Sequence, residues 1–431
     1  MEQAGKNTNK YDTYLLYEYM KKISYTVRIL VKLKENVDSG LLNEAAQEAI
    51  TRFPYFAVKV RVDEGGSFVF DHNENPIPVL PEENKRLMLG SDKTGGHLFA
   101  ITYRDNCVWF NFSHSPCGAF GGLFWIKSTL YQYLTKKYGE ITAPADLKLV
   151  GSPIPETETE LPDASKLPED EPLKRYDGKS TKIGLDRFLK FLLNPFAKDN
   201  YYYEITIPAD KFMEYARSLD GSPNTVFAAF FFKTVAGYFK TEPDDVLSGR
   251  IADDYRNDIG ADESYRDFTR LLHIRYTKSM ENDSVEKLIR VARGAVILQM
   301  QPELSCERYR QIEDIHKGID EQTDLKSKKK YASSHSLFRS DARDVFSVSY
   351  VGKTDWGGME DYISEVHTVT DGDFMLEVNA LKDKFCLSFQ LINKDRRPVD
   401  LFCKVLEEEG LPFTVSEMKT RYLPDLELPK K

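Results

Sequence analysis

The chain has few cysteines and no long apolar run, and each absence excludes a class of protein. Its 5 cysteines among 431 residues are scattered, with neither paired zinc spacing nor a disulfide framework, as is typical of a reducing cytoplasm. No stretch approaches the ~18 apolar residues of a membrane-spanning helix. The polar residues 1–10 lack the apolar region of a signal peptide. The sequence predicts a soluble, cytoplasmic protein with no membrane span.

An excess of basic residues is also missing. The formal net charge is −9, with acids and bases interspersed, which argues against a nucleic-acid partner. Hydrophobic residues make up 41% of the chain and aromatic residues 12%, including 26 Phe and 24 Tyr, enough for a large core. A chain of 431 residues is long enough for two domains or one two-lobed body.

The most informative stretch is residues 111–122, which contain His114-Ser-Pro-Cys-Gly-Ala. It follows an alternating, strand-like run at 108–112 and precedes a run with one apolar face that Gly139 ends. His114 is therefore expected where a strand ends and a turn leads into a helix. Side chains that a rigid scaffold holds in such turns often carry function.

This motif resembles the His-x-x-x-Asp-Gly motif of the chloramphenicol acetyltransferase-like superfamily. That superfamily includes alcohol acetyltransferases, to which the chain is most similar, and the condensation domains of peptide synthetases. Gly118 stands at the Asp position and Ala119 at the Gly position, while Gly121 falls where many members carry another small residue. Ser113 and Cys117 complete the motif turn. The resemblance implies an α/β fold of mixed sheets and helices in two lobes, with a cleft or tunnel between them.

The rest of the chain supports this organisation. Mixed strand and helix patterns occupy 1–145 and again 200–431, the predicted N-terminal and C-terminal lobes. Residues 146–199 are rich in proline and acidic residues and lose strong periodicity until about residue 185, so we expect a crossover linker there.

Segments of the second half extend the resemblance. Residues 250–256 are similar to a Val-Asp-Leu-Arg loop, with Asp254 and Arg256 on its polar, structural positions, and 265–268 to the Arg-Asn-Phe that accompanies it. Residues 345–352 are similar to a late Ser-Asn-Leu-Gly strand. Ser347, Ser349 and Tyr350 on this strand are the expected oxyanion or acceptor-side groups.

The chemistry expected of His114 is that of a general base. A neutral imidazole can take a proton from an incoming hydroxyl or amine near pH 7. In the superfamily the motif Asp mainly holds the turn through an ion pair. Because Gly118 removes it, we expect main-chain hydrogen bonds and the packing of Phe120 and Trp125 to hold the turn instead, without an ion pair.

The sequence therefore predicts an O- or N-acyltransferase with a small-molecule acceptor. The resemblance implies acyl-CoA as co-substrate, or an acyl group on the phosphopantetheine of a carrier protein, and no bound cofactor or metal. Two alternatives stay open, namely a condensation-type enzyme or auxiliary that uses carrier-bound acyl groups, and a non-catalytic binding relative.

Other motifs are weaker. A Cys117–His114 nucleophile pair lacks an orienting carboxylate nearby in the sequence. An acidic group at Asp253, Asp254 and Asp258 has the wrong spacing for a magnesium site of prenyl-transfer enzymes and is better explained as a solvated loop. The basic run 326–330 could touch phosphates but is more typical of an exposed helix or loop.

Overall fold

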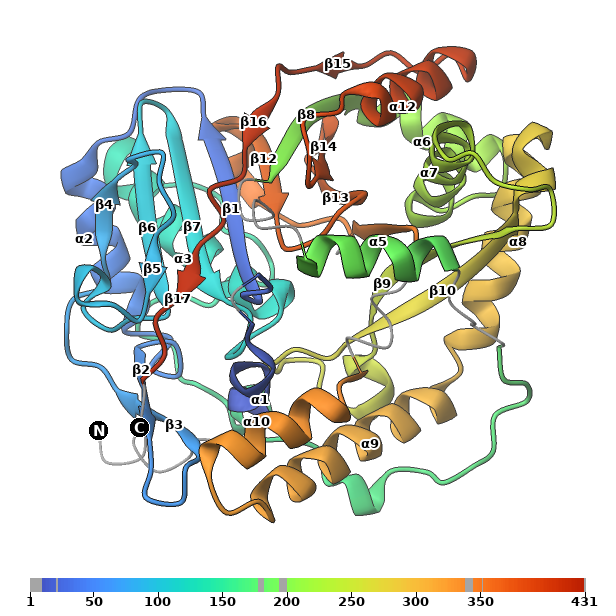
Figure 1. Cartoon of the computed structure of the whole chain (residues 1–431). Helices are drawn as coiled ribbons and strands as arrows, with labels where there is room; N and C mark the ends of the chain where they lie inside the picture. Colours follow the sequence, from blue (N-terminus) through green and yellow to red (C-terminus); the bar gives the residue numbers. More distant parts are fainter. Residues whose placement is uncertain are drawn as a thin grey trace.

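A computed structural model of the chain describes residues 10–20, 22–176, 182–193, 200–337, 344–350 and 352–429. Two mixed β-sheets lie side by side, and each has its own hydrophobic core (Figure 1). The first sheet has five strands in the order β12-β1-β7-β6-β4. They are β1 (Thr26–Leu33), β4 (Val79–Pro81), β6 (Phe99–Arg104), β7 (Cys107–Ser113) and β12 (Ile363–Val369).

Two helices cover the first sheet, α2 (Ser39–Ile50) and α3 (Ala119–Tyr138). Asp38 begins α2 because its carboxylate accepts the main-chain N–H groups of Gly40 and Leu41. No side chain caps α3, which begins after Gly118. Strand β7 therefore leads through a short turn straight into α3.

The second sheet has eight strands. Seven follow the order β10-β9-β11-β13-β14-β8-β15, and β16 also pairs with β8. Their bounds are β8 (Tyr201–Pro208), β9 (Val246–Asp254), β10 (Thr269–Thr277), β11 (Phe346–Tyr350), β13 (Met375–Ala380), β14 (Lys384–Leu391), β15 (Thr414–Val415) and β16 (Lys419–Thr420). Strand β11 runs parallel to both β9 and β13, so its residues lie in the middle of the sheet.

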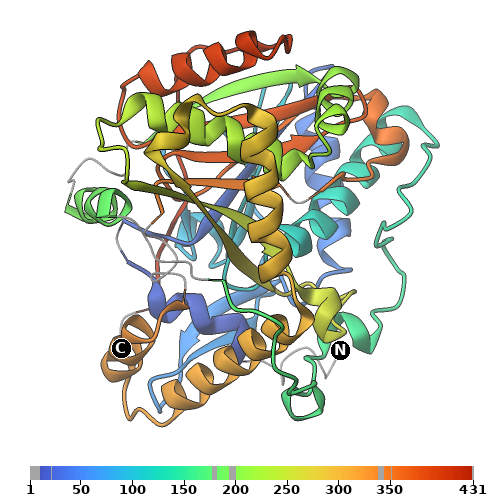
Figure 2. The same cartoon turned by 90° about the vertical axis from the view of Figure 1, so that its right-hand side faces the viewer.

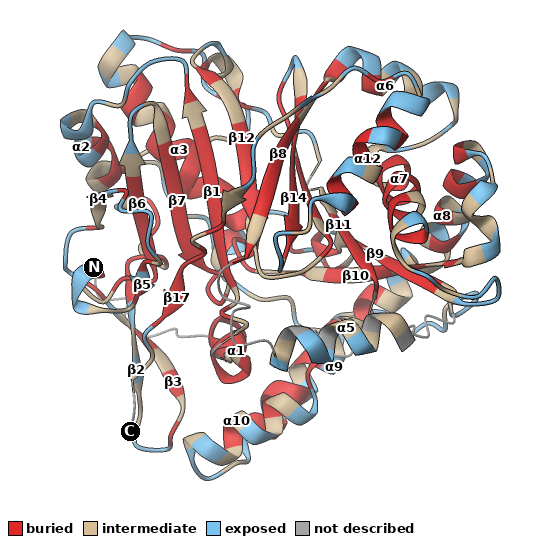
Figure 3. Ribbon diagram, turned by 45° about the horizontal axis from the view of Figure 1, so that its top comes forward, coloured by how far each residue is buried: buried red, intermediate tan, exposed pale blue. Residues whose placement is uncertain are grey.

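Helices α6 (Ala209–Ser218), α7 (Pro223–Tyr238), α8 (Val285–Gln299) and α12 (Arg397–Glu408) pack on this sheet. Ser222 and Thr225 form a capping box at the start of α7. That helix is apolar almost all round and is buried among its neighbours, as Figure 3 shows.

The segment between the two halves crosses the surface (Figure 2). It contains α4 (Glu156–Thr159), the short helix η2 (Ala164–Lys166) and α5 (Lys182–Leu193). Glu158 fastens it to the first lobe, because Oε2 lies 2.8 Å from Nη2 of the buried Arg52. The chain also returns to the first lobe later, because β12 pairs with β1.

The remaining elements are short or lie along the lower edge in Figure 1. They are α1 (Lys10–Glu18), α9 (Pro302–Asp320), α10 (Leu325–Ser334), the paired β2 (Val58–Val62) and β3 (Phe68–His72), the paired β5 (Met88–Leu89) and β17 (Asp425–Leu426), and the 3-10 turns η1 (Asp92–Thr94), η3 (Arg256–Ile259), η4 (Lys278–Asn282) and η5 (Gly357–Asp361). Among the described residues, no helix combines the length and apolar character needed to span a bilayer.

Candidate active site

His114 lies in the turn between β7 and α3. Its main-chain N–H donates to the carbonyl of Tyr25, at 2.7 Å, which ties the turn to the start of β1. The side chain is 25% exposed and lines a cavity of about 680 Å³. The lining comes from the start of α3 on one side and from β9, β11 and β13 on the other. The imidazole therefore faces the space between the two lobes.

A carboxylate from the second half pairs with this imidazole. Oδ2 of Asp267 lies 3.1 Å from Nδ1 of His114, within ion-pair distance although outside hydrogen-bond geometry. Nε2 makes no hydrogen bond with any residue that the structure describes. The prediction that no ion pair holds this turn is wrong. The missing motif carboxylate is replaced from a segment far away in the sequence, a contact that local pattern could not reveal.

Asp267 occupies the space next to Gly118. A β-carbon on Gly118 would lie 2.8 Å from Oδ1 of Asp267 and 3.3 Å from its Cα. The expected main-chain contacts of the turn are present, including the hydrogen bond from Gly122 N–H to Gly118 C=O at 3.0 Å. Trp125 is fully buried in the first core, as expected. These contacts act together with the ion pair.

The ion pair governs the charge state of both partners. Burial lowers the pKa of His114, but the Asp267 carboxylate, helped by the histidine's own main-chain carbonyl and by Glu377, raises that pKa above its ordinary value. Burial acts to raise the pKa of Asp267, yet His114 and Thr269 bring it below its ordinary value. Thr269 contributes its main-chain N–H, which donates to Oδ1 at 3.0 Å. Asp267 is therefore held as a carboxylate.

Asp254 and Arg256 were predicted as structural loop residues, and both line the cavity. Asp254 ends β9, and Arg256 begins η3. Their side chains form an ion pair at 2.7 Å. The Arg256 guanidinium stacks 3.9 Å from the Phe120 ring centroid and donates to the carbonyls of Ser264 and Arg266. Arg256 thus binds the segment that carries Asp267 to the start of α3.

Ser347, Ser349 and Tyr350 also line the cavity, on β11. Arg250 donates from Nε to Oγ of Ser347, so the hydroxyl hydrogen of Ser347 stays available for another acceptor. Ser349 lies one alternation along the same face and bonds Glu377. The ring of Tyr350 lies 5.9 Å from that of Phe385 in the second core, and burial raises its pKa to about 12.

Ser113 and Cys117 do not line the cavity. Ser113 is buried, and its Oγ accepts the N–H of Ser115 at 3.2 Å. Cys117 is fully buried, and burial raises the pKa of its thiol well above the ordinary value. A buried, protonated thiol is a poor nucleophile, so this position serves packing.

Two carboxyl groups of the cavity lie on residues that the sequence analysis missed. Glu377 on β13 is buried, which raises its pKa, and it accepts from Thr370 Oγ1 at 2.7 Å. Asp371 accepts the N–H groups of Ser24 and Tyr25, both at 2.9 Å, and burial raises its pKa to about 6. Neither residue belongs to a local motif, since only the pairing of distant strands brings them to the site.

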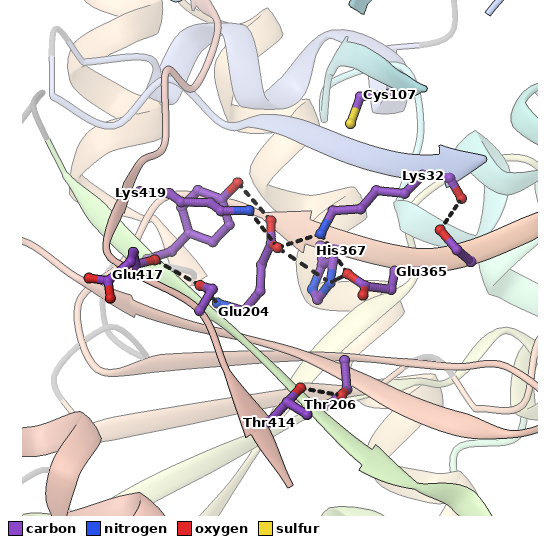
Figure 4. Close-up of polar contacts among 12 residues, drawn as sticks. Lys32, Cys107, Glu204, Thr206, Glu365, His367, Thr414, Glu417 and Lys419 are labelled. Carbon is purple, nitrogen blue, oxygen red and sulfur yellow. Dashed lines mark hydrogen bonds and ion pairs between the residues drawn. The ribbon is translucent and has the colours of Figure 1, made fainter. Parts of the chain in front are cut away.

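A second group of charged side chains lies between the sheets, outside this cavity (Figure 4). Glu204, Glu365 and His367 place their ligand atoms within 4.8 Å of one another, a geometry that could hold a metal ion. However, Nζ of Lys32 lies 2.6 Å from both carboxylates, and Lys419 lies 2.6 Å from Glu204. These two ammonium groups balance the two carboxylates, so the charges of this cluster, which links the lobes, are neutralised by the protein's own side chains.

The weaker motifs resolve into structural contacts. Asp253 pairs with Arg270 at 2.7 Å, and Asp258 lies 3.6 Å from the same guanidinium. These carboxylates are therefore neutralised by the protein itself. In the basic run, Lys328 is buried, and its Nζ donates to the carbonyl of Ile319 at 3.0 Å. This hydrogen bond links α10 to the end of α9.

Several solved structures share this fold. TRI101 of F. graminearum, complexed with coenzyme A and T-2 mycotoxin, aligns with a TM-score of 0.57 and 11% identity over 92% of this chain and 98% of that chain. TRI3 trichothecene 15-O-acetyltransferase from Fusarium sporotrichioides aligns with a TM-score of 0.53 and 11% identity over 93% of each chain. The first condensation domain of the calcium-dependent antibiotic synthetase, in complex with a substrate analogue, aligns with a TM-score of 0.54 and 12% identity. This alignment covers 94% of this chain and 96% of that chain.

At such low identity this likeness defines the fold alone. The chain has the two-lobed α/β fold that the sequence analysis expected from the chloramphenicol acetyltransferase-like superfamily, and that prediction is confirmed. No known protein-family profile and no curated protein sequence matches the chain.

Proposed function

We propose that the protein is an acyltransferase that moves an acyl group from a thioester to a hydroxyl or amine acceptor, with His114 as its general base. One observation carries this proposal. The His114 imidazole is paired through Nδ1 to Asp267, while Nε2 has no partner among the described residues and the ring lines the cavity between the lobes.

In the proposed reaction, Nε2 of His114 takes the proton of the acceptor as its oxygen or nitrogen attacks the thioester carbonyl. The carbonyl π electrons move onto oxygen and form a tetrahedral oxyanion. When this intermediate collapses, the C–S bond breaks and the sulfur leaves with the proton that His114 holds. Acceptor and thioester become an ester or amide and a free thiol, without a metal or redox step.

Ser347 is the best-placed donor to the oxyanion on the second-lobe side. Its oxygen accepts from the cationic Arg250, which polarises the O–H bond and leaves the hydrogen to point elsewhere. A pre-oriented donor of this kind stabilises charge that develops only in the transition state.

The acyl donor we propose is acyl-CoA, with a phosphopantetheine-linked acyl group as the alternative. TRI101 is complexed with coenzyme A and T-2 mycotoxin, and TRI3 is a trichothecene 15-O-acetyltransferase, whereas the condensation domain belongs to a synthetase. The non-catalytic alternative rested on the missing Asp at position 118. Because Asp267 places a carboxylate beside that position, the geometry favours the catalytic proposal.

The test is thiol release from a panel of acyl-CoAs and from an acyl carrier protein, with alcohol and amine acceptors. His114→Ala should lower turnover by about 10²- to 10⁴-fold, the usual contribution of a general base. The matched control is His72→Ala, because His72 is exposed on β3 and does not line the cavity.

Equal turnover of His114→Ala and wild type would contradict the role of His114 as base. If no donor and acceptor pair gives acceptor-dependent thiol release with the wild type, the enzymatic proposal fails. Direct binding of acyl-CoA without turnover would then support the binding-protein alternative.

A further inference from the structure

We propose that Asp267 is the positioning residue of His114 and that it supplies, from the second lobe, the carboxylate that the turn after β7 lacks. This inference rests on the proposed function, because it names the residue that holds the proposed base. Its new content is that two segments distant in sequence assemble the base and its carboxylate across the lobe interface.

The first argument is the position of the carboxylate. Oδ2 lies 3.1 Å from His114 Nδ1, and Oδ1 lies 2.8 Å from where a β-carbon of Gly118 would be. Any side chain at position 118 would therefore point at the Asp267 carboxylate. A glycine there leaves the space that Asp267 fills.

The second argument is that Asp267 itself is held firmly. Oδ1 accepts the main-chain N–H of Thr269 at 3.0 Å, and the carbonyl of Asp267 accepts from Tyr11 Oη at 2.7 Å. The side chain also lies at the N-terminal end of α3, where the helix dipole favours negative charge. These contacts hold the carboxylate in one orientation against the imidazole.

The third argument is that the preceding residues are clamped onto the first lobe. The ring of Tyr265 stacks on that of Tyr55, with centroids 3.9 Å apart and planes 4° apart. Arg266 forms a buried ion pair with Asp12 at 2.6 Å. The carbonyl oxygen of Tyr265 lies so close to Gly121 that a β-carbon there would come within 1.9 Å of it. Docking of this segment therefore determines where Asp267 lies.

The consequence is that the orientation of the base depends on contact between the lobes. With its Nδ1 against Asp267, His114 presents Nε2 to the cavity. A displacement of residues 265–267 would release the ring. A base that moves by about 1 Å can lose on the order of 100-fold in rate.

The test compares Asp267→Asn with the swap variant Gly118→Asp/Asp267→Gly. Asp267→Asn keeps the shape of the side chain but removes its charge. We expect kcat to fall by about 10- to 100-fold with little change in KM, since a group that supports a functional side chain typically contributes on this scale. The swap should recover part of that loss, because it returns a carboxylate to the turn and frees the space that Asp267 occupied.

An activity-independent readout separates this inference from the proposed function. The pKa of His114, followed by NMR of its ring, should fall in Asp267→Asn, because the carboxylate that stabilises the imidazolium is lost. The rising limb of the kcat/KM profile should move to lower pH together with it. Glu377, the other acidic group that raises this pKa, stays in place. Asp146→Asn is the control, since Asp146 pairs with Lys127 outside the cavity.

An unchanged His114 titration together with unchanged kcat in a folded Asp267→Asn variant would overturn the inference. If that variant does not fold, the swap variant decides. If the swap variant folds, recovers turnover and keeps the pKa of His114 at its wild-type value, the inference is supported. If it folds but recovers neither turnover nor that pKa, the inference is overturned. If the wild type transfers no acyl group, the proposed function fails, whereas the titration still decides the pairing of His114 with Asp267.

Discussion

The carbonyl oxygen of Tyr265 lies so close to Gly121 that a β-carbon at position 121 would be only 1.9 Å from it. Both groups are main chain or directly attached to it, so neither can rotate out of the contact. The start of α3 and the segment that carries Asp267 can approach this closely only because position 121 is glycine.

Gly121→Ala should therefore separate these segments. We expect a loss of about 1–3 kcal/mol in the free energy of unfolding, the usual cost of forcing an extra carbon into a packed site, and lower acyltransferase activity. Gly294→Ala in α8 is the matched control. Gly294 is exposed with no neighbour within 4 Å, so alanine should stabilise that helix by about 0.5–1 kcal/mol. Urea unfolding of both variants and the wild type measures these free energies. A Gly121→Ala variant as stable as the wild type would contradict the close contact between Gly121 and Tyr265.

Ser347→Ala tests the donor proposed for the oxyanion. Loss of one such donor typically lowers kcat by about 10²- to 10³-fold, and KM should change little because the charge appears only in the transition state. Steady-state kinetics with the best acyl-CoA measures the effect, and Ser218→Ala on the exposed face of α6 is the control. A raised KM with unchanged kcat would assign Ser347 to substrate binding.

The activity of the wild type should rise with pH through the pKa of His114. A general base works in its neutral form, and the Asp267 carboxylate stabilises the protonated form, so the pKa lies above its ordinary value. Activity is therefore lost as pH falls through that raised pKa. A kcat/KM profile that is flat from about pH 5 to 8, the range in which histidine titrates, would contradict this.

Glu158→Gln tests the anchor of the crossover segment. Glu158 is fully buried against Arg52, so the neutral variant leaves a buried guanidinium without its counter-charge, at a cost of about 3–5 kcal/mol. Burial acts to raise the pKa of Glu158, but Arg52 and Tyr55 bring it below its ordinary value. This stabilisation is present above the unfolded-state pKa and is lost as pH falls through the folded-state pKa. Denaturation curves against pH measure it, with the exposed Glu160→Gln as control.

Glu365→Gln tests the charge cluster between the lobes. His367 and then Lys32 lower the pKa of Glu365 to about 2, whereas an unfolded glutamate titrates near about 4.3. The contacts of Glu365 with His367 and Lys32 therefore stabilise the fold above about pH 4.3, and this stabilisation is lost as pH falls toward 2. It contributes about 1–3 kcal/mol to the free energy of unfolding. In Glu365→Gln the free energy of unfolding, measured by denaturation at a series of pH values, should fall less steeply at acid pH than in the wild type. This acid part of the curve is the acid limb. An unchanged acid limb would contradict the pairing. The control is Glu83→Gln, which should change the limb far less, because the exposed ion pair of Glu83 with Lys93 contributes little to stability.

Much of the fold could be predicted from the sequence, because local patterns decide local structure. The alternating run at 108–112 indicated β7, and the apolar face that Gly139 ends indicated α3. These features depend on hydrogen bonds and burial within a few residues, which a sequence displays directly. The two-lobed α/β fold was also predicted, through motif segments that occur in the expected order.

The site was predictable only in part. His114 and the strand of Ser347 carry local signals, and the structure brings both to one cavity. Glu377 carries none, and the motif segment 265–268 gives no sign that its Asp267 contacts His114. Both residues reach the cavity only through the pairing and docking of distant segments.

The sequence by itself determined which strands and helices form, and that a histidine would stand at the end of a strand with glycine in place of the motif aspartate. Only the tertiary structure decided what stands beside that histidine. A glycine specifies no contact, only space, and what fills the space depends on which segment packs there. Here the lobes dock so that Asp267 enters the space next to Gly118, and His114 forms its ion pair with this residue of the other lobe.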